Sequence, residues 1–237
     1  MEKFKVYLAE FIGTLLLIAI GTGTALFSAQ AGLVAVAFAF GFAIIISAYA
    51  FGAISGAHLN PAVSFAMAMN KRISWLDFLG YAGAQVLGAL TGSAMILGVW
   101  LSTGMVESKM LKVLPLGSTT YAGQNMIPVS ATGAFVIEAI LTFVLVLVIL
   151  MVTSEKFGAG AVTGVVIALT LAGLILVGGN LTGASLNPAR SFGPAMMEAF
   201  LGNTKAIGQM GIYLLGPMVG AALAAVIAKF FGSEEVA

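Results

Sequence analysis

Six long apolar stretches dominate this sequence. A transmembrane helix needs about 20 mostly apolar residues, and six runs reach that length. They lie at about residues 6–29, 33–52, 80–102, 130–153, 160–178 and 207–231. Of the 237 residues, 60% are hydrophobic and only 8% are charged, whereas a soluble domain carries about 25% charged residues. We therefore predict an all-α membrane protein with six transmembrane helices.

The charge balance and the cysteine count exclude several functional classes. The formal net charge is +1 and no basic tract is present, so we expect no nucleic-acid partner. The chain has no cysteine and a single histidine, which argues against disulfides, thiol nucleophiles and a protein-bound metal. We expect neither a cofactor nor an enzymatic activity.

Two further apolar stretches, 60–70 and 187–199, are only about half as long as a membrane span. Each opens with the same tripeptide, Asn60-Pro61-Ala62 in the first and Asn187-Pro188-Ala189 in the second. An Asn before a Pro is typical of a helix start, because the Asn side chain can cap the helix and Pro fits its first turn. We expect two short helices that enter the membrane without crossing it.

These tripeptides belong to an internal repeat. Residues 54–65 align without gaps with residues 181–192, and eight of the twelve positions are identical. Glu10 precedes Asn60 by 50 residues, and Glu138 precedes Asn187 by 49. Each unit holds three spans, so the second must enter from the opposite face, related to the first by a pseudo-two-fold axis in the membrane plane. We predict one domain over 1–237, with repeat one at about 1–102, repeat two at about 130–237 and an external loop between them.

The basic residues of the loops predict the orientation. Six fall on one side of the six-span arrangement, namely Lys3, Lys5, Lys71, Arg72, Lys156 and Lys229, and three on the other, namely Lys109, Lys112 and Lys205. Because positively charged loops stay in the cytoplasm, we expect both termini to be cytoplasmic and the loop at about 103–129 to be external.

The inverted repeat brings the two half-helix N-termini together near the midplane. Their free N–H groups, their dipoles and the amides of Asn60 and Asn187 would repel cations and hydrogen-bond a neutral molecule such as water. Arg190 is the only base inside an apolar region, and such a residue by default marks a functional pathway. This pattern favours a pore that rejects protons and cations.

Three other polar residues allow two interpretations each. Glu10 and Glu138 could relay protons in an inverted-repeat secondary transporter, or accept hydrogen bonds from the loop backbone and hold the half-helices in place. We favour the supporting role, because a coupled transporter needs a titratable group at the midplane. His58 is either a hydrogen-bonded loop residue or a pH-sensitive element. Paired with Ser185, it would also be the only conceivable base of an intramembrane enzyme.

The paired Asn-Pro-Ala motifs, the segment 187–194 and the paired glutamates resemble the aquaporin and glycerol-facilitator family, also called major intrinsic proteins. The likeness covers almost the whole chain and is strongest to prokaryotic, archaeal-type aquaporins. It implies a right-handed helical bundle that forms homotetramers in the cell membrane, with one pore in each subunit. Carried over to this sequence, the family's selectivity filter falls on Phe40, Ile175, Ala184 and Arg190.

The filter departs from the strict water-channel pattern. Those channels usually have a His where this chain has Ile175, so we expect a wider and less polar pore. Glycerol facilitators have an Asp after the family's Arg, whereas Ser191 follows it here. We predict a passive channel for water that also admits small uncharged solutes such as glycerol at lower rates.

Overall fold

The computed structural model describes residues 1–104, 114–121 and 127–232, and within these ranges the regular structure is helical. Six of the described helices are long and apolar enough to cross a membrane. They cover Glu2–Phe27, Ala29–Ser55, Trp75–Ser102, Ala131–Val152, Gly160–Thr182 and Met210–Phe230. The prediction of an all-α protein with six membrane spans is confirmed.

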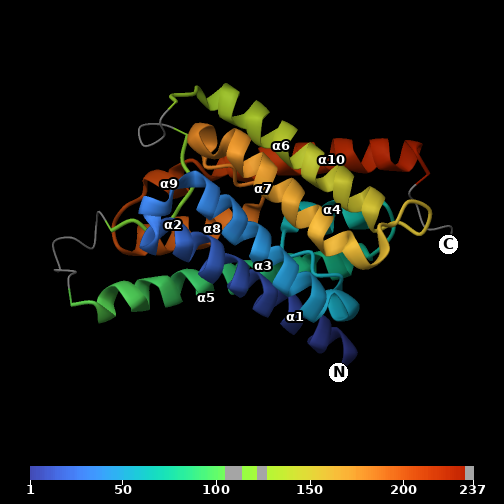
Figure 1. Ribbon diagram of the computed structural model, residues 1–237, viewed down its shortest axis with the longest axis horizontal. Helices are drawn as coiled ribbons and strands as arrows, with labels where there is room; N and C mark the ends of the chain where they lie inside the picture. Colours follow the sequence, from blue (N-terminus) through green and yellow to red (C-terminus); the bar gives the residue numbers. More distant parts are fainter. Residues whose placement is uncertain (105–113, 122–126, 233–237) are drawn as a thin grey trace.

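The helices lie roughly side by side, with the N-terminal start of α1 and the C-terminal end of α10 at one end of the molecule and the end of α5 at the other (Figure 1). In chain order they are α1 (Glu2–Leu17), α2 (Gly23–Phe27), α3 (Gly32–Ser55), α4 (Pro61–Met69), α5 (Trp75–Ser102), α6 (Ala131–Val152), α7 (Thr163–Thr182), α8 (Pro188–Phe200), α9 (Lys205–Gly208) and α10 (Met210–Phe230). A π-helical turn, Ile18–Thr22, joins α1 and α2 into a single span.

The two half-helices, α4 and α8, begin at the prolines of the two tripeptides. Asn60 caps α4 by accepting a hydrogen bond from the N–H of Ala62 at 2.9 Å, and Asn187 caps α8 by accepting from Ala189 at 3.0 Å. The helices have nine and 13 residues, so neither is long enough to cross a bilayer. α4 lies toward the end that holds the termini and α8 toward the opposite end (Figure 1).

The helices pack in matching pairs. In the first repeat α1 packs on α5, and in the second α6 packs on α10. Each half-helix also contacts the last long helix of the other repeat, because α4 packs on α10 and α8 on α5. α3 and α7 pack against each other between the two repeats. These paired contacts are those of an inverted three-helix repeat.

Glycines allow the closest of these approaches. A Cβ atom on Gly88 of α5 would overlap the carbonyl oxygen of Phe11 on α1, and a Cβ atom on Gly220 of α10 would overlap that of Ala139 on α6. Phe11 and Ala139 each follow a glutamate of the repeat, so the two contacts are equivalent. Small residues at such positions let helix backbones approach closely in membranes.

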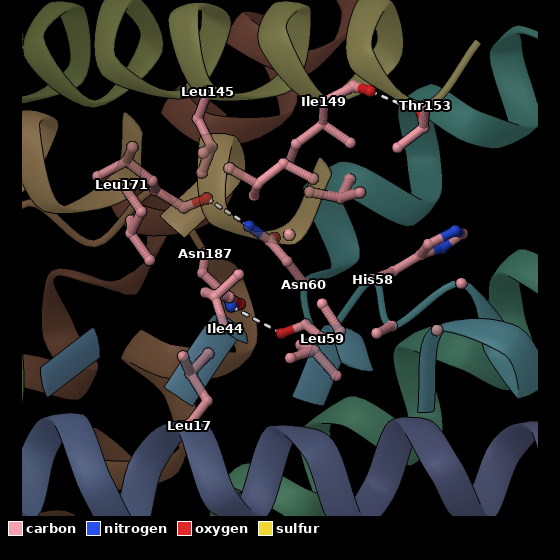
Figure 2. Close-up of a pocket in the computed structure, with 18 of the residues that line it drawn as sticks. Leu17, Ile44, His58, Leu59, Asn60, Leu145, Ile149, Thr153, Leu171 and Asn187 are labelled. Carbon is pink, nitrogen blue, oxygen red and sulfur yellow. Dashed lines mark hydrogen bonds between the residues drawn. The ribbon is translucent and has the colours of Figure 1, made fainter. Parts of the chain in front are cut away.

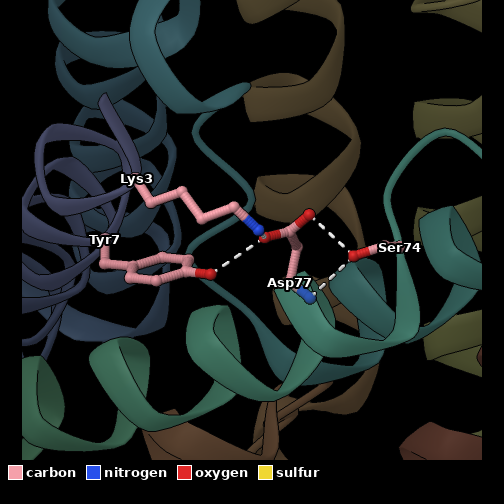
Figure 3. A network of polar contacts seen from close by, with 4 residues as sticks. All are labelled: Lys3, Tyr7, Ser74 and Asp77. Carbon is pink, nitrogen blue, oxygen red and sulfur yellow. Dashed lines mark hydrogen bonds and ion pairs between the residues drawn. The ribbon is translucent and has the colours of Figure 1, made fainter. Parts of the chain in front are cut away.

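The third span is longer than its apolar run because α5 starts at Trp75, five residues earlier than hydropathy alone predicts. Ser74 caps the helix by accepting from the N–H of Asp77 at 3.0 Å. The Asp77 carboxylate also accepts from Lys3 Nζ at 2.7 Å and from the Tyr7 hydroxyl at 2.9 Å (Figure 3). This polar first turn lowers the local hydropathy, and it fastens α1 to α5 at the end that holds the termini.

Substituting Gly88 by Ala should destabilise the fold, because the new methyl group meets backbone that cannot move aside. Overpacking of this kind costs about 1–3 kcal/mol, which corresponds to a fall of about 5 °C in melting temperature for a chain of this size. Thermal unfolding in detergent measures the change. Gly83→Ala on the same helix is the control, because its Cβ would meet nothing within 4 Å; equal melting temperatures for the two variants would contradict the packing argument.

Candidate functional site

One cavity of about 420 Å³ lies along the interior of the bundle, between α3, α6, α7 and the loops before the half-helices. Asn60 and Asn187 both line it (Figure 2). All four residues of the expected filter line the same cavity, namely Phe40, Ile175, Ala184 and Arg190. Tyr49 and Thr153 line it as well. Most of the remaining lining side chains are apolar, so the few polar groups are concentrated at defined points.

The loops before α4 and α8 have an unusual backbone. Gly56 and Gly183 end α3 and α7 in the left-handed conformation, with φ of 84° and 82°. Left-handed residues with side chains follow, and they are Ala57 and Leu59 in one loop and Ala184 and Leu186 in the other, with φ of 49°, 52°, 42° and 55°. Such conformations cost about 1–3 kcal/mol each and persist only where the surroundings hold them.

The carboxylate of Glu10 holds the first loop. It is fully buried and accepts hydrogen bonds from the backbone N–H groups of His58 at 2.9 Å and Leu59 at 2.7 Å. The hydroxyl of Ser55 and the amide of Gln85 donate to the same carboxylate at 2.7 and 2.8 Å. Ser55 ends α3, His58 and Leu59 lie in the loop and Gln85 lies on α5, so this carboxylate joins α1 to the segment directly before the first half-helix and to α5.

Glu138 does the same in the second repeat. Its buried carboxylate accepts from the N–H groups of Ser185 at 3.0 Å and Leu186 at 2.8 Å, and from the hydroxyl of Thr182 at 2.7 Å. The Tyr213 hydroxyl donates to the Thr182 carbonyl at 2.7 Å, which ties the end of α7 to α10. The two carboxylates therefore make equivalent contacts at equivalent positions.

The two asparagines also join the loops to each other. Asn60 Nδ2 donates to the carbonyl of Leu186 at 2.8 Å, and Asn187 Nδ2 donates to the carbonyl of Leu59 at 2.8 Å (Figure 2). Each side chain thus caps its own half-helix with its oxygen and reaches the opposite loop with its nitrogen. The sequence predicts that both amides face the lumen, and no sequence pattern predicts these crossed hydrogen bonds.

Arg190 lies in the first turn of α8, with a relative exposure of 7%. Its Nη1 donates to the carbonyl of Gly117 at 2.9 Å, and its guanidinium carbon lies 5.0 Å from the centre of the Phe40 ring. A cation at a helix N-terminus is unfavourable against the helix dipole. The Gly117 carbonyl and the face of the Phe40 ring supply the compensating contacts.

Glu198 near the end of α8 is a positioning residue that sequence reasoning missed. Its carboxylate accepts from the N–H of Leu116 at 2.9 Å and from the hydroxyl of Ser118 at 2.8 Å. Those contacts hold the described part of the connection between α5 and α6 against α8, with the Gly117 carbonyl beside Arg190. The only available signal was a carboxylate within an otherwise uncharged and largely apolar segment, 191–202.

His58 lines the cavity to one side of the asparagine pair (Figure 2). Its Nδ1 lies 3.0 Å from Ser64 Oγ, and its ring packs 4.8 Å from that of Tyr81. The hydroxyl of Ser185 pairs with Ser191 at 2.5 Å. His58 and Ser185 therefore have different partners, and the two do not form the nucleophile–base pair that an intramembrane enzyme would need.

Six spans, two half-helices and a cavity at their meeting point define a multi-pass membrane protein of the channel class. The model of the major intrinsic protein family matches residues 1–228. The chain belongs to this family, whose members are channels and not enzymes.

Several relatives match along nearly their whole length. The chain is 45% identical to glycerol uptake facilitator protein-like 6 of Lactiplantibacillus plantarum, over 97% of this chain and 99% of the relative. It is 35% identical to aquaporin AqpM of Methanothermobacter marburgensis, over 96% and 97%. The solved structure of the aquaglyceroporin from Plasmodium falciparum superposes with a TM-score of 0.83 at 25% identity, covering 97% of both chains.

Replacing Glu138 by Gln should destabilise the second loop. The amide of a glutamine offers one acceptor oxygen, so its NH2 group would face a backbone N–H that the carboxylate now satisfies. An unsatisfied buried donor costs about 1–3 kcal/mol, which should lower both the melting temperature and the water permeability of proteoliposomes.

Glu155→Gln is the matched control for this variant, because Glu155 is exposed just beyond the end of α6. If Glu138→Gln kept the wild-type melting temperature but lost solute uptake driven by a pH gradient, the carboxylate would be a proton relay and not a loop support.

Proposed function

We propose that the protein is a passive channel that conducts water down an osmotic gradient and also passes small uncharged solutes such as glycerol. The observation that carries this proposal is the single cavity on which both asparagines and Arg190 converge. The names of the relatives include aquaporins, an aquaglyceroporin and a glycerol uptake facilitator, so they support water and glycerol together.

In this proposal the asparagine pair orients the permeant at the centre of the pore. An amide nitrogen carries two hydrogens, and one hydrogen of each is used between the loops. The second can donate to a water molecule, which then turns its own hydrogens away from the centre on both sides. The N-termini of α4 and α8 add positive potential. A chain of waters broken in this way does not conduct protons, and cations are repelled.

The filter selects by size and polarity. Phe40 and Ile175 supply apolar walls, and the small side chain of Ala184 takes up little of the space in the cavity. Arg190 has five N–H donors, so it can hydrogen-bond a solute while it holds the Gly117 carbonyl. Two apolar walls and one donor face suit a solute such as glycerol, which has a hydroxyl-bearing side and a carbon-backbone side.

The carboxylates of Glu10 and Glu138 act as loop supports in this proposal. Each accepts hydrogen bonds from two backbone N–H groups and at least one side chain. A proton relay would have to give up these contacts whenever it became protonated. The alternative of a proton-coupled secondary transporter also has no support among the named relatives.

We further propose a homotetramer in the cell membrane, with one pore per subunit and both termini in the cytoplasm. Basic residues support this orientation. Lys156 Nζ lies 3.5 Å from the Phe231 carbonyl near the end of α10, and Arg72 Nη1 donates to Thr153 at 2.8 Å, so these cations share the end that holds the termini. Lys205 lies on α9 at the other end (Figure 1), and Lys109 and Lys112 lie outside the described residues.

The domain organisation is proposed on the same basis. The chain forms one membrane domain over 1–237, with repeat one at about 1–102 and repeat two at about 130–237. The matching helix pairs and the equivalent glutamate contacts support this division.

Stopped-flow light scattering on proteoliposomes tests the proposed function. With an impermeant osmolyte the vesicles should shrink faster than empty liposomes, and with glycerol they should then re-swell. Ile175→His should lower glycerol permeability more than water permeability, by about tenfold in their ratio, because the longer imidazole reaches further into the filter and replaces an apolar wall with a polar one. Ile175→Leu keeps the volume and is the control. An equal fall of both permeabilities would contradict a filter at this position.

Arg190→Val should keep the fold and raise proton or cation flux several-fold, because Arg190 is the only Lys or Arg among the described residues that line the cavity. A pH-sensitive dye inside the liposomes measures the leak. Lys205→Val removes a cation from the same end of the molecule, outside the cavity, and should not leak. A flux through Arg190→Val no higher than that of wild type would disprove exclusion by this residue.

A further inference from the structure

The π-helical turn in the first span has no equivalent in the corresponding span of the second repeat. Gly23 donates its N–H to the carbonyl of Ile18, five residues earlier, and the turn covers Ile18–Thr22. The corresponding span, α6, is α-helical throughout from Ala131 to Val152. Single π-turns inside α-helices are rare and often occur at functional sites. Because only the first of these two equivalent spans has a π-turn, we expect its cause to lie among the neighbours of residues 18–22.

Gly21 lies inside this turn, buried behind the Phe40 ring. A Cβ atom on Gly21 would overlap Cδ1 and Cε1 of Phe40 and would lie 2.6 Å from its Cγ. Real Cβ atoms do not come that close to a neighbour, so the ring rests directly on the glycine backbone. Any side chain at position 21 would displace the ring.

The Phe40 ring lies between Gly21 and the cavity. It lines the cavity and faces the guanidinium of Arg190 at 5.0 Å. On the side of the first span the ring packs against Gly21, and the ring also belongs to the apolar core of the bundle. A ring pushed away from Gly21 therefore moves toward the cavity and toward Arg190, and the opening between them becomes narrower.

The repeat supplies an internal comparison. Gly21 follows Glu10 by eleven residues, as Ile149 follows Glu138, and Phe40 precedes Asn60 by 20, as Ile167 precedes Asn187. Both isoleucines line the same cavity. A glycine–aromatic pair at the filter thus corresponds to a pair of isoleucines in the other repeat. In the first repeat, the large side chain of Phe40 on α3 packs against Gly21, a residue without a side chain, on the first span.

We infer that Gly21, presented by the π-turn, is a specificity-determining residue of the channel, because it seats the Phe40 ring against the helix and so sets the width of the filter. This inference rests on the proposed function, in which Phe40 forms one wall of the filter. Gly21 does not touch the permeant and acts through Phe40, so it is a positioning residue.

Gly21→Ala in proteoliposomes tests the inference. The glycerol-to-water permeability ratio should fall by about tenfold, since a filter narrowed by one methyl group excludes the larger solute first. If the wild type conducts water alone, the water permeability itself should fall. Gly23→Ala is the matched control in the same helix, because Gly23 is also buried and its Cβ would meet nothing within 4 Å.

Rescue separates a positioning role from simple misfolding. Gly21→Ala combined with Phe40→Leu should regain glycerol permeability, because the smaller side chain relieves the overlap. An unchanged permeability ratio in Gly21→Ala, or a loss that Phe40→Leu does not relieve, would overturn the inference.

A wild-type protein that accelerates neither water nor glycerol would instead overturn the proposed function. The contact between Gly21 and Phe40 would then still be tested by the melting temperatures of Gly21→Ala, Phe40→Leu and the double variant, compared in a double-mutant cycle. Coupling between positions 21 and 40 is expected, and additive effects would overturn the seating of the ring on the glycine.

Discussion

The structure depends on satisfying backbone hydrogen bonds at membrane depth. Non-helical backbone inside a bilayer exposes N–H and C=O groups where no bulk water can reach them. Two such segments precede α4 and α8, and each contains left-handed residues that a free chain would avoid. The buried carboxylates of Glu10 and Glu138 accept from these N–H groups, and the crossed amides of Asn60 and Asn187 serve a carbonyl on each side. Without those acceptors and donors neither half-helix could begin where it does.

The two halves of the chain share this scaffold and differ in what they place on it. The first repeat has Val63 where the second has Arg190, and His58 where the second has Ser185. The first repeat in turn supplies the Phe40 ring that faces Arg190. Phe40 lies on α3, and the first span has a glycine, Gly21, where this ring packs against it. Symmetry therefore accounts for the framework, while Phe40 and Arg190 of the proposed filter lie at positions where the two repeats differ.

Much of the architecture could be predicted from the sequence, because hydropathy, helix caps and an internal repeat are local or periodic signals. The starts of the half-helices at Pro61 and Pro188 could be predicted because an Asn cap followed by Pro is a local signal. The Asp77 network and the early start of α5 could not be predicted, since polar residues at a helix end lower the very signal that locates a span. The contacts of Glu198 with Leu116 and Ser118 join positions about 80 residues apart. No periodicity encodes such a pair, and the same holds for the seating of Phe40 on Gly21.

The crossed asparagine contacts also bear on how the chain matures during synthesis. The first loop needs the Leu186 carbonyl and the second needs the Leu59 carbonyl, and these pairs are 126 and 128 residues apart. At roughly 5–20 residues per second, the ribosome takes about 6–25 s to supply the missing partner. Throughout that interval the first three spans hold an unfinished re-entrant segment, whose exposed polar groups must be met by water or by the insertion machinery. The first repeat therefore reaches its final structure only late in translation, when the Leu186 carbonyl becomes available to Asn60.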